Sequence, residues 1–262
     1  MLRLYHAGPS VSAIKVRLAL HEKNLPWSSE LLNVHHGDQF TAAYRRLNPN
    51  GVVPTLVHDD RPIVESTVIL EYLEDSFPQP ALMPAGAHER AAARLWMKKI
   101  DDYLHAACGA LTFAIAFRPQ LLKKSREELE ARFAAVPDPN LRQRQRESVL
   151  LGFEAPQIAP ALRNYGKFID DMEATLVRSP YLAGDSYSLA DVAATPYVNR
   201  AAMLTIDAIV LDNRPLVAAW FERIRARPSF TAAITDWMSE DDRDNFRIPR
   251  DETVQQLRRL SG

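Results

Sequence analysis

The sequence predicts an N-terminal α/β domain followed by an all-helical domain, and three observations support this prediction. Up to residue 77, short stretches that alternate apolar and polar residues, such as LRLY at residues 2–5, stand between helical patterns. Residues 78–87 contain three prolines and a glycine, which is typical of a linker. Further along, apolar residues recur at helical spacing and strand signals are scarce. We therefore expect domains at residues 1–78 and 89–262, joined by a linker at residues 79–88.

The first domain is expected to contain a strand, a helix, a second strand, a short helix, a hairpin and a final helix. The first helix ends near Asn24, a residue type that tolerates the left-handed backbone of helix ends. Asp59-Asp60 separates two strand-like stretches and is expected to form the hairpin turn. Ser66 is placed to cap the final helix. In chain order, the elements are expected at residues 2–5, 14–24, 27–32, 39–47, 54–64 and 66–77.

The second domain is expected to be helical throughout. Apolar residues at helical spacing predict one long helix over residues 90–117. Ser125 and Glu128 have the spacing of a capping box, which predicts that another helix begins there. Further helices are expected at residues 158–177, 188–203 and 215–227.

The composition excludes several classes of protein. Of the 262 residues, 47% are hydrophobic and 25% are charged, as in ordinary globular proteins. The net charge of −1 gives no attraction to nucleic acid or to an acidic membrane, so we expect neither as a partner. Cys108 is the only cysteine, which excludes an intramolecular disulfide, and the histidines lack metal-ligand spacing, so no metal is expected. No stretch approaches about 20 apolar residues and no signal pattern opens the chain, which favours a cytoplasmic protein.

Two serines stand where the first strand has ended and the first helix begins. Ser10 and Ser12 lie in the stretch GPSVSAIKVRLAL, and helix capping explains either of them when it is taken alone. The alternative is that one hydroxyl addresses a ligand. The residues themselves do not decide between these explanations.

Two further stretches allow both a structural and a ligand-binding explanation. Pro54 opens a strand, as proline commonly does, but a cis bond after Val53 would turn the Val53 backbone outward to pair with an extended peptide. Ser66 is most simply a helix cap. The same helix N-terminus would also favour a carboxylate, and Glu65 beside it could receive an ammonium group, as in the zwitterionic end of an amino acid.

Taken together, these stretches resemble a known family. LYHAGPSVSAIKVRLALHEKNL, RRLNPNGVVPTLVHDD and IVESTVILEYLEDSFP are similar in content and order to the N-terminal domain of the cytosolic glutathione transferases of the serine type. In that family, this domain has a thioredoxin-like fold. YLAGDSYSLADVAATPY resembles the start of a helix in the family's C-terminal domain, with Ser188 and Asp191 as a capping box. The resemblance covers most of residues 1–230.

The resemblance implies roles for individual residues. It places the catalytic hydroxyl on Ser10, with Ser12 as the second choice, and glutathione as the co-substrate. It also implies a set of glutathione-binding residues: Gln39 for the glycine carboxylate, the Val53 backbone before a cis bond to Pro54 for the cysteinyl part, and Glu65 with Ser66 for the γ-glutamyl end.

The chemistry of a thiol explains why a serine is suitable. A free thiol has a pKa near ~8.5, so little thiolate is present at neutral pH. A hydroxyl that donates a hydrogen bond to the thiolate contributes roughly 1.5–3 kcal/mol, which lowers the thiol pKa by about 1–2 units. The dipole of the following helix acts in the same direction.

The resemblance also implies a hydrophobic, aromatic electrophile and a homodimer. Candidates for the electrophile pocket are Tyr103, Phe113, Phe117 and Tyr197, although aromatic residues at helical spacing commonly belong to the core. The long segment 118–157 is similar to bacterial members that cleave β-aryl ethers of lignin-derived aromatics, but the serine register differs. Three alternatives stay open: such an etherase, a glutathione- or ligand-binding protein without turnover, and a protein-interaction module.

Overall fold

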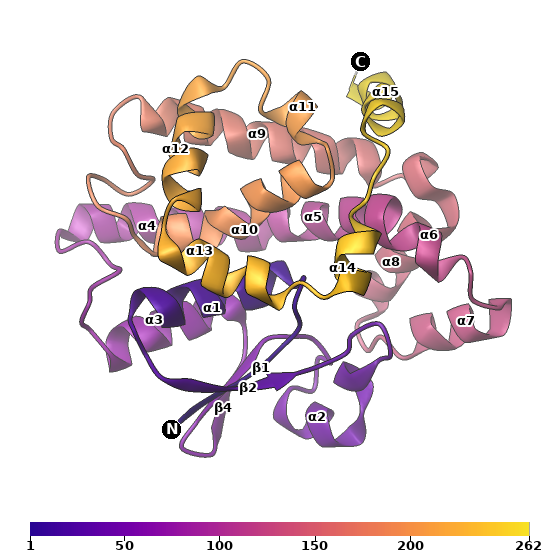
Figure 1. Ribbon diagram of the computed structural model, residues 1–262, viewed down its shortest axis with the longest axis horizontal. Coiled ribbons are helices and arrows are strands. Elements are labelled where there is room, and N and C mark those ends of the chain that lie inside the picture. The colour runs from indigo at the N-terminus through magenta and orange to yellow at the C-terminus, as the bar shows by residue number, and fades with distance from the viewer. Residues whose placement is uncertain (262) are drawn as a thin grey trace. The chain divides into compact units, whose positions relative to one another are not determined.

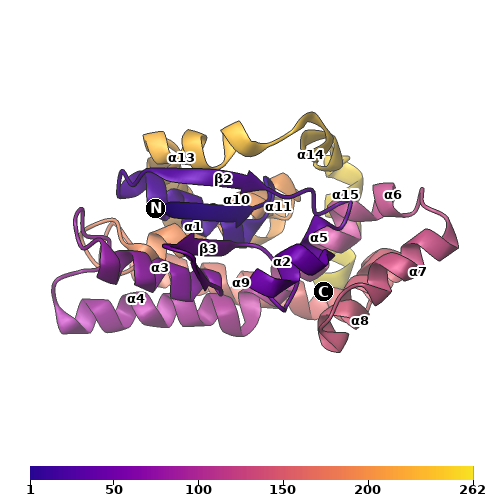
Figure 2. The same cartoon turned by 90° about the horizontal axis from the view of Figure 1, so that it is seen from below.

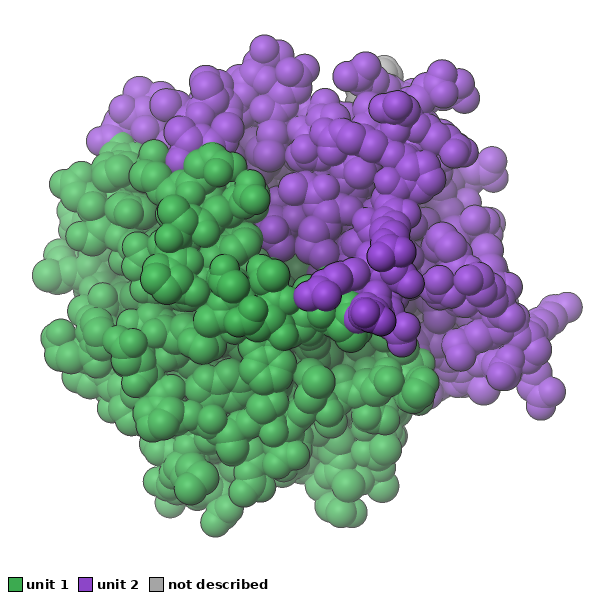
Figure 3. Space-filling view, viewed as in Figure 1, with its two compact units in different colours: residues 1–97, 179–196, 220–239 green, residues 98–178, 197–219, 240–262 purple. Residues whose placement is uncertain are grey.

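The computed structural model describes residues 1–261 and divides into two compact units (Figure 3). The first unit comprises residues 1–97, 179–196 and 220–239. The second comprises residues 98–178, 197–219 and those from 240 onward. The expected classes are confirmed, because all four strands lie in the first unit and the rest of the described chain is helical. In residues 1–261, no helix is both long enough and apolar enough to cross a membrane.

A four-stranded mixed sheet forms the centre of the first unit (Figure 2). The strands are β1 (Leu2–His6), β2 (Trp27–Leu31), β3 (Thr55–His58) and β4 (Arg61–Ile63), and their order is β2-β1-β3-β4. β1 runs parallel to β2 and antiparallel to β3, and β3 runs antiparallel to β4. This is a thioredoxin-like arrangement, as expected from the resemblance.

Three helices accompany the sheet: α1 (Val11–Glu22), α2 (Ala42–Leu47) and α3 (Ser66–Ser76) (Figure 1). α1 packs against α3, and both contribute fully buried leucine and isoleucine side chains to the core. Asn24 follows α1 with φ 52°, which confirms its place at the helix end. The prediction of a single short helix at residues 39–47 is wrong for residues 39–41. A 3₁₀ turn, η1 (Asp38–Phe40), comes first, and Thr41 then caps α2 by accepting a bond from the Tyr44 amide at 3.4 Å.

The prediction that Ser66 caps α3 is wrong. Ser66 is the first residue of the helix, and the N-cap position belongs to Glu65, whose side chain makes no capping bond. Glu65 has φ 65° and ψ 109°, so the chain turns into the helix one residue earlier than a Ser66 cap would allow. A non-glycine residue with positive φ costs about 1–3 kcal/mol, and such residues cluster at functional sites.

Two backbone features expected from the sequence are confirmed. Asp59 and Asp60, with φ 47° and 63°, form the hairpin turn between β3 and β4, as a type I′ turn requires. The peptide bond between Val53 and Pro54 is cis.

The remaining elements are helical, and the long helix expected at residues 90–117 is confirmed with wider limits. It runs from Ala87 to Leu121 and contains two π-helical turns. The capping box is confirmed, because the Ser125 amide donates to Glu128 Oε2 at 2.7 Å and the Glu128 amide donates to Ser125 Oγ at 3.2 Å. In chain order, the elements are α4 (Ala87–Lys99), η2 (Ile100–Leu104), α5 (His105–Thr112), η3 (Phe113–Phe117), α6 (Arg118–Leu121), α7 (Arg126–Ala134), α8 (Pro139–Leu151), η4 (Gly152–Glu154), α9 (Ile158–Leu176), α10 (Leu189–Met203), α11 (Asp207–Val210), α12 (Pro215–Arg225), α13 (Pro228–Ala233), η5 (Thr235–Trp237), α14 (Glu240–Asn245) and α15 (Arg250–Ser261).

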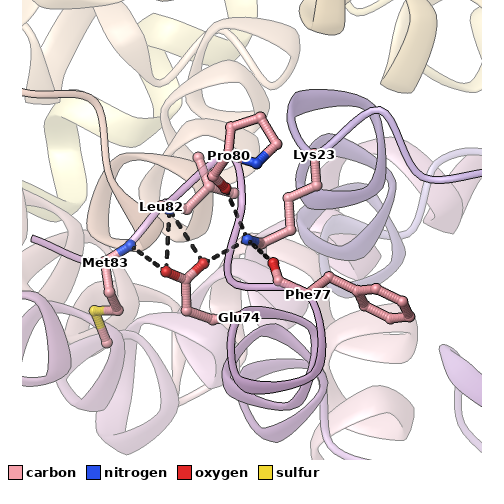
Figure 4. A network of polar contacts seen from close by, with 6 residues as sticks. All are labelled: Lys23, Glu74, Phe77, Pro80, Leu82 and Met83. Atoms are coloured by element: carbon pink, nitrogen blue, oxygen red, sulfur yellow. Dashed lines mark hydrogen bonds and ion pairs between the residues drawn. The ribbon is translucent and has the colours of Figure 1, made fainter.

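A buried ion pair fixes the segment after α3 in the first unit (Figure 4). Lys23 Nζ lies 2.6 Å from Glu74 Oε2, and the two side chains are 0% and 8% exposed. Lys23 also donates to the carbonyls of Phe77 and Pro80 at 2.7 and 2.9 Å. The Glu74 carboxylate accepts hydrogen bonds from the backbone amides of Leu82 and Met83 at 3.0–3.2 Å. The end of α1 thus holds the chain that leads from α3 toward α4.

Candidate active site

The loops that carry the candidate glutathione-binding residues leave the sheet at one edge. β1, β2 and β4 all end at this edge, because β1 is parallel to β2 and antiparallel to β3, while β4 reverses β3. Ser10 follows the end of β1, Gln39 follows β2, Pro54 precedes the start of β3, and Glu65 follows β4. The topology therefore gathers four stretches that are far apart in the sequence, all within the first unit.

Ser10 is the N-cap of α1. Its backbone is extended, with φ −69° and ψ 116°, and its Oγ accepts a bond from the Ala13 amide at 3.3 Å. This bond leaves the hydroxyl proton available to a ligand, and the acceptor role strengthens the hydroxyl as a donor. Ser12 lies inside the first turn of α1 and is half-buried like Ser10. Ser10 therefore occupies the N-cap position of α1, whereas Ser12 is a residue within the helix.

Gln39 lies in η1 and is 7% exposed. Its Nε2 donates to the Val34 carbonyl at 3.4 Å, which leaves a second N–H on the same nitrogen. Its Oε1 is buried and has no hydrogen-bond partner within residues 1–261. Buried polar atoms without partners are rare in proteins, so this oxygen has room for a donor that is not part of the described chain.

The chain around Val53 is held by side chains from α2 and its end. The Tyr44 hydroxyl and Asn48 Nδ2 donate to the Val52 carbonyl at 2.6 and 2.9 Å. Gly51 has φ 61°, and a Cβ there would lie 3.1 Å from the Phe40 ring. Glycine at this position thus permits the close approach of η1 to the segment that leads into Val53. The sequence does not predict these roles of Tyr44 and Asn48, since their partners are the Val52 carbonyl and the Thr55 hydroxyl, which no motif connects to them.

Glu65 and Ser66 form the start of α3. Glu65 is exposed and Ser66 is 8% exposed. The neighbouring Thr67 Oγ1 accepts a bond from Lys15 Nζ at 3.3 Å, and Lys15, on α1, is itself 1% exposed. This bond joins the second turn of α1 to the first turn of α3, and the N-terminus of each helix follows a strand that ends at the same edge of the sheet.

The four aromatic candidates for the electrophile pocket all lie in the second unit. Tyr103 is half-buried below the Lys167 ammonium, 5.4 Å from its ring, and burial raises the pKa of its phenol to about 12. Phe113 and Phe117 are half-buried against the cluster of Leu121, Leu129, Phe133 and Val149. Tyr197 is 0% exposed and its hydroxyl lies 3.0 Å from His105 Nδ1, so it belongs to the core of this unit.

A cavity of 360 Å³ lies next to Phe113 and Phe117, entirely within the second unit. One wall comes from η3, α6 and the nearby Phe153, and the other from the end of α14 and the chain leading into α15. Asn245 Oδ1 is buried in this region without a partner among the described residues. The sequence does not predict this cavity, because the C-terminal residues that line it form no recognisable motif.

Comparison with known proteins agrees with the fold of both parts of the chain. The model of the glutathione S-transferase N-terminal domain matches residues 9–76, and that of the C-terminal domain matches residues 105–228. These matches define a protein with a thioredoxin-like domain and a helical transferase domain. The chain belongs to the glutathione transferase family.

Individual relatives extend this comparison. LigF from Sphingobium sp. is 31% identical over 248 residues, which span 92% of this chain and 95% of LigF. The crystal structure of that β-etherase has a TM-score of 0.80 and covers 88% of this chain and 98% of its own. A tetrachloro-p-hydroquinone reductive dehalogenase from Sphingobium chlorophenolicum is 30% identical and covers 88% of this chain and 94% of its own. A glutathione transferase from Burkholderia graminis, solved with two glutathione molecules per subunit, is 26% identical with a TM-score of 0.66 and covers 89% of this chain and 87% of its own.

Proposed function

We propose that the protein is a glutathione transferase that uses Ser10 to hold glutathione as a thiolate for attack on a hydrophobic, aromatic electrophile. The observation that carries the proposal is the meeting of Ser10, Gln39, Val53-Pro54 and Glu65 at one edge of the sheet. Family membership and the glutathione seen in a related structure support the choice of ligand.

Each residue has a chemical task in this proposal. The Val53 backbone, turned by the cis bond to Pro54, pairs with the cysteinyl part of glutathione in the manner of an added strand. Glu65 receives the ammonium group, and Ser66 with the amides of α3 receives the α-carboxylate. Gln39 uses its second N–H for the glycine carboxylate. The sulfur then lies at the N-terminus of α1, where the Ser10 hydroxyl donates to it.

The first experiment follows the ultraviolet absorbance of the thiolate of bound glutathione across pH, in the natural protein and in Ser10→Ala. We expect the pKa of the bound thiol to lie about 1–2 units below that of free glutathione. Ser10→Ala should lose this difference and lower kcat/KM about 10- to 100-fold, because the charge-assisted bond is removed. Ser12→Ala is the matched control and should resemble the natural protein. If Ser12→Ala loses the difference and Ser10→Ala keeps it, the role belongs to Ser12.

A second candidate reaction is the glutathione-dependent cleavage of a β-aryl ether, which the likeness to the β-etherase LigF favours. The chemistry is the same displacement: the thiolate attacks carbon, a carbon–sulfur bond forms, and an aryloxide leaves with the ether bond electrons. The cavity beside η3, lined by Phe153 and by both small apolar and polar side chains, is a candidate place for part of the substrate. The assay measures phenol released from a β-aryl ether dimer in the presence of glutathione, and the absence of phenol would exclude this reaction.

We also propose that the protein is a homodimer. Val68 on α3 and Leu95 on α4 are 55% and 61% exposed, and apolar side chains that two helices expose together offer a face for a second copy. Arg94 and Glu71 join the same two helices by a bidentate ion pair at 2.9 Å. Sedimentation of the natural protein and of a Val68→Glu variant tests whether this face holds two copies together.

A further inference from the structure

Arg17 is buried in the first unit and reaches the loop that leads to Ser10. The residue is 0% exposed. Its Nη1 donates to the Ala7 carbonyl at 3.1 Å, and its Nη2 donates to the Gly8 carbonyl at 2.7 Å. The Ala7 carbonyl also accepts the Ser10 amide at 3.3 Å. The guanidinium therefore bonds to the two carbonyls that immediately precede Pro9-Ser10.

The surroundings of Arg17 leave its positive charge uncompensated. Its other partners are His6 Nδ1 at 2.9 Å and the Ala233 carbonyl at 2.7 Å, and no carboxylate contacts it in residues 1–261. Burial lowers the pKa of Arg17 to about 9, so the guanidinium stays charged at neutral pH. Burial and the charge of Arg17 lower the pKa of His6 to about 3, so His6 stays neutral there. His6 therefore accepts from Arg17 at Nδ1 and donates from Nε2 to Ser29 Oγ at 2.8 Å.

The C-terminal part of the first unit completes this environment. α13 packs against α1, and Ala233 at its end supplies the carbonyl that receives Arg17 Nε (Figure 1). The Trp237 ring lies 5.6 Å from the Arg17 guanidinium and 4.6 Å from the His6 ring. The Arg17 side chain thus connects Ala233 and Trp237 to the loop that leads to Ser10.

We propose that Arg17 is a positioning residue for thiol activation. Its guanidinium, which donates to the Ala7 and Gly8 carbonyls, fixes this backbone so that the Ser10 hydroxyl can donate a hydrogen bond to the sulfur of glutathione. Its positive charge also favours the thiolate. The inference rests on the proposed function, since it assigns Arg17 to the same thiolate. Two observations support the proposal. Arg17 donates hydrogen bonds to the Ala7 and Gly8 carbonyls in the loop before Ser10, and its buried guanidinium has no carboxylate partner in residues 1–261. A merely structural arginine could be replaced, in a variant that still folds, without a change in the pKa of the bound thiol.

The test titrates the thiolate of bound glutathione in the natural protein, Arg17→Lys and Arg17→Met. Arg17→Met removes the charge and the fork, so we expect the pKa of the bound thiol to rise by about 1 unit and kcat to fall about 10-fold. Arg17→Lys keeps the charge but cannot hold both carbonyls, so it should recover part of the lost pKa difference. Glutathione KM should change less than about 3-fold in either variant, because neither removes a group that binds the peptide.

Arg200→Met in the second unit is the matched control. Arg200 is likewise buried, at 4% exposure, and its Nη1 donates to Thr112 Oγ1 at 3.0 Å. This variant should lose stability but leave the thiol pKa unchanged. An unchanged thiol pKa in Arg17→Met would overturn the proposal, as would an unchanged value in a folded Arg17→Lys if Arg17→Met does not fold. If the natural protein itself shows no lowered thiol pKa, the proposed function fails together with the role of Arg17.

Discussion

Replacing Lys23 by Met is expected to lower the free energy of unfolding by about 3–5 kcal/mol. The ammonium group is 0% exposed and lies 2.6 Å from a Glu74 carboxylate that is 8% exposed. Methionine has a similar length and removes the charge, so the buried Glu74 carboxyl group loses its counter-ion and keeps only the amides of Leu82 and Met83 as partners. The carbonyls of Phe77 and Pro80 also lose their donor. An uncompensated buried charge accounts for most of the expected loss.

The Lys23 prediction is tested by urea unfolding of single and double variants. Adding Glu74→Gln to Lys23→Met should recover part of the loss, because the amide oxygen still accepts from the backbone while the buried charge is gone. Lys98→Met is the matched control: Lys98 forms an exposed i,i+4 pair with Asp102, and its loss should cost below about 1 kcal/mol. If Lys23→Met and Lys98→Met unfold at the same urea concentration, the ion pair does not stabilise the fold.

The elements that the sequence predicts well are those whose side chains alternate or recur over several turns. The strands, α1, the hairpin turn and the long helix belong to this group. The helices α11, α13, α14 and α15 were not expected. Helices of four to six residues, such as α11, α13 and α14, show too little periodicity to be recognised and owe their stability to packing. The π-helical turns were not expected either, because no residue type in the sequence marks a turn with i→i+5 hydrogen bonds.

The sequence proposes candidate site residues where short stretches resemble a family. Ser10, Val53-Pro54 and Glu65 stand in stretches that resemble a family, so their positions could be inferred from the sequence. Arg17 could not be assigned in this way, because its partners are the backbone carbonyls of residues 7, 8 and 233 and the ring of His6, which no sequence motif connects to it. Its only signal in the sequence is a charged residue inside the apolar run AIKVRLAL, every member of which is buried. A charge in a fully buried helix requires partners that the sequence does not name.

Replacing Asp191 by Ala is expected to cost about 3–5 kcal/mol of unfolding free energy. Asp191 is 0% exposed and stands at the third position of α10. Its Oδ1 accepts from Trp220 Nε1 at 2.8 Å and from the Leu182 amide at 3.1 Å. Its Oδ2 accepts from the amide and the hydroxyl of Ser188, each at 3.0 Å, which confirms the capping pair expected from the sequence. Alanine would leave these buried donors without an acceptor, and it would also remove the cap of the helix.

Two variants separate the carboxylate from the loop that surrounds it. Burial raises the pKa of Asp191, while the bonds from Trp220, Leu182 and Ser188 oppose this shift, so the carboxylate depends on all of its donors. Asp191→Asn keeps one acceptor oxygen and should lose less than Asp191→Ala. Asp185→Ala, an exposed carboxylate in the same loop, should change stability by less than about 0.5 kcal/mol. If Asp191→Ala unfolds within about 1 kcal/mol of the natural protein, water replaces the lost acceptor and the buried network is not what fixes the start of α10.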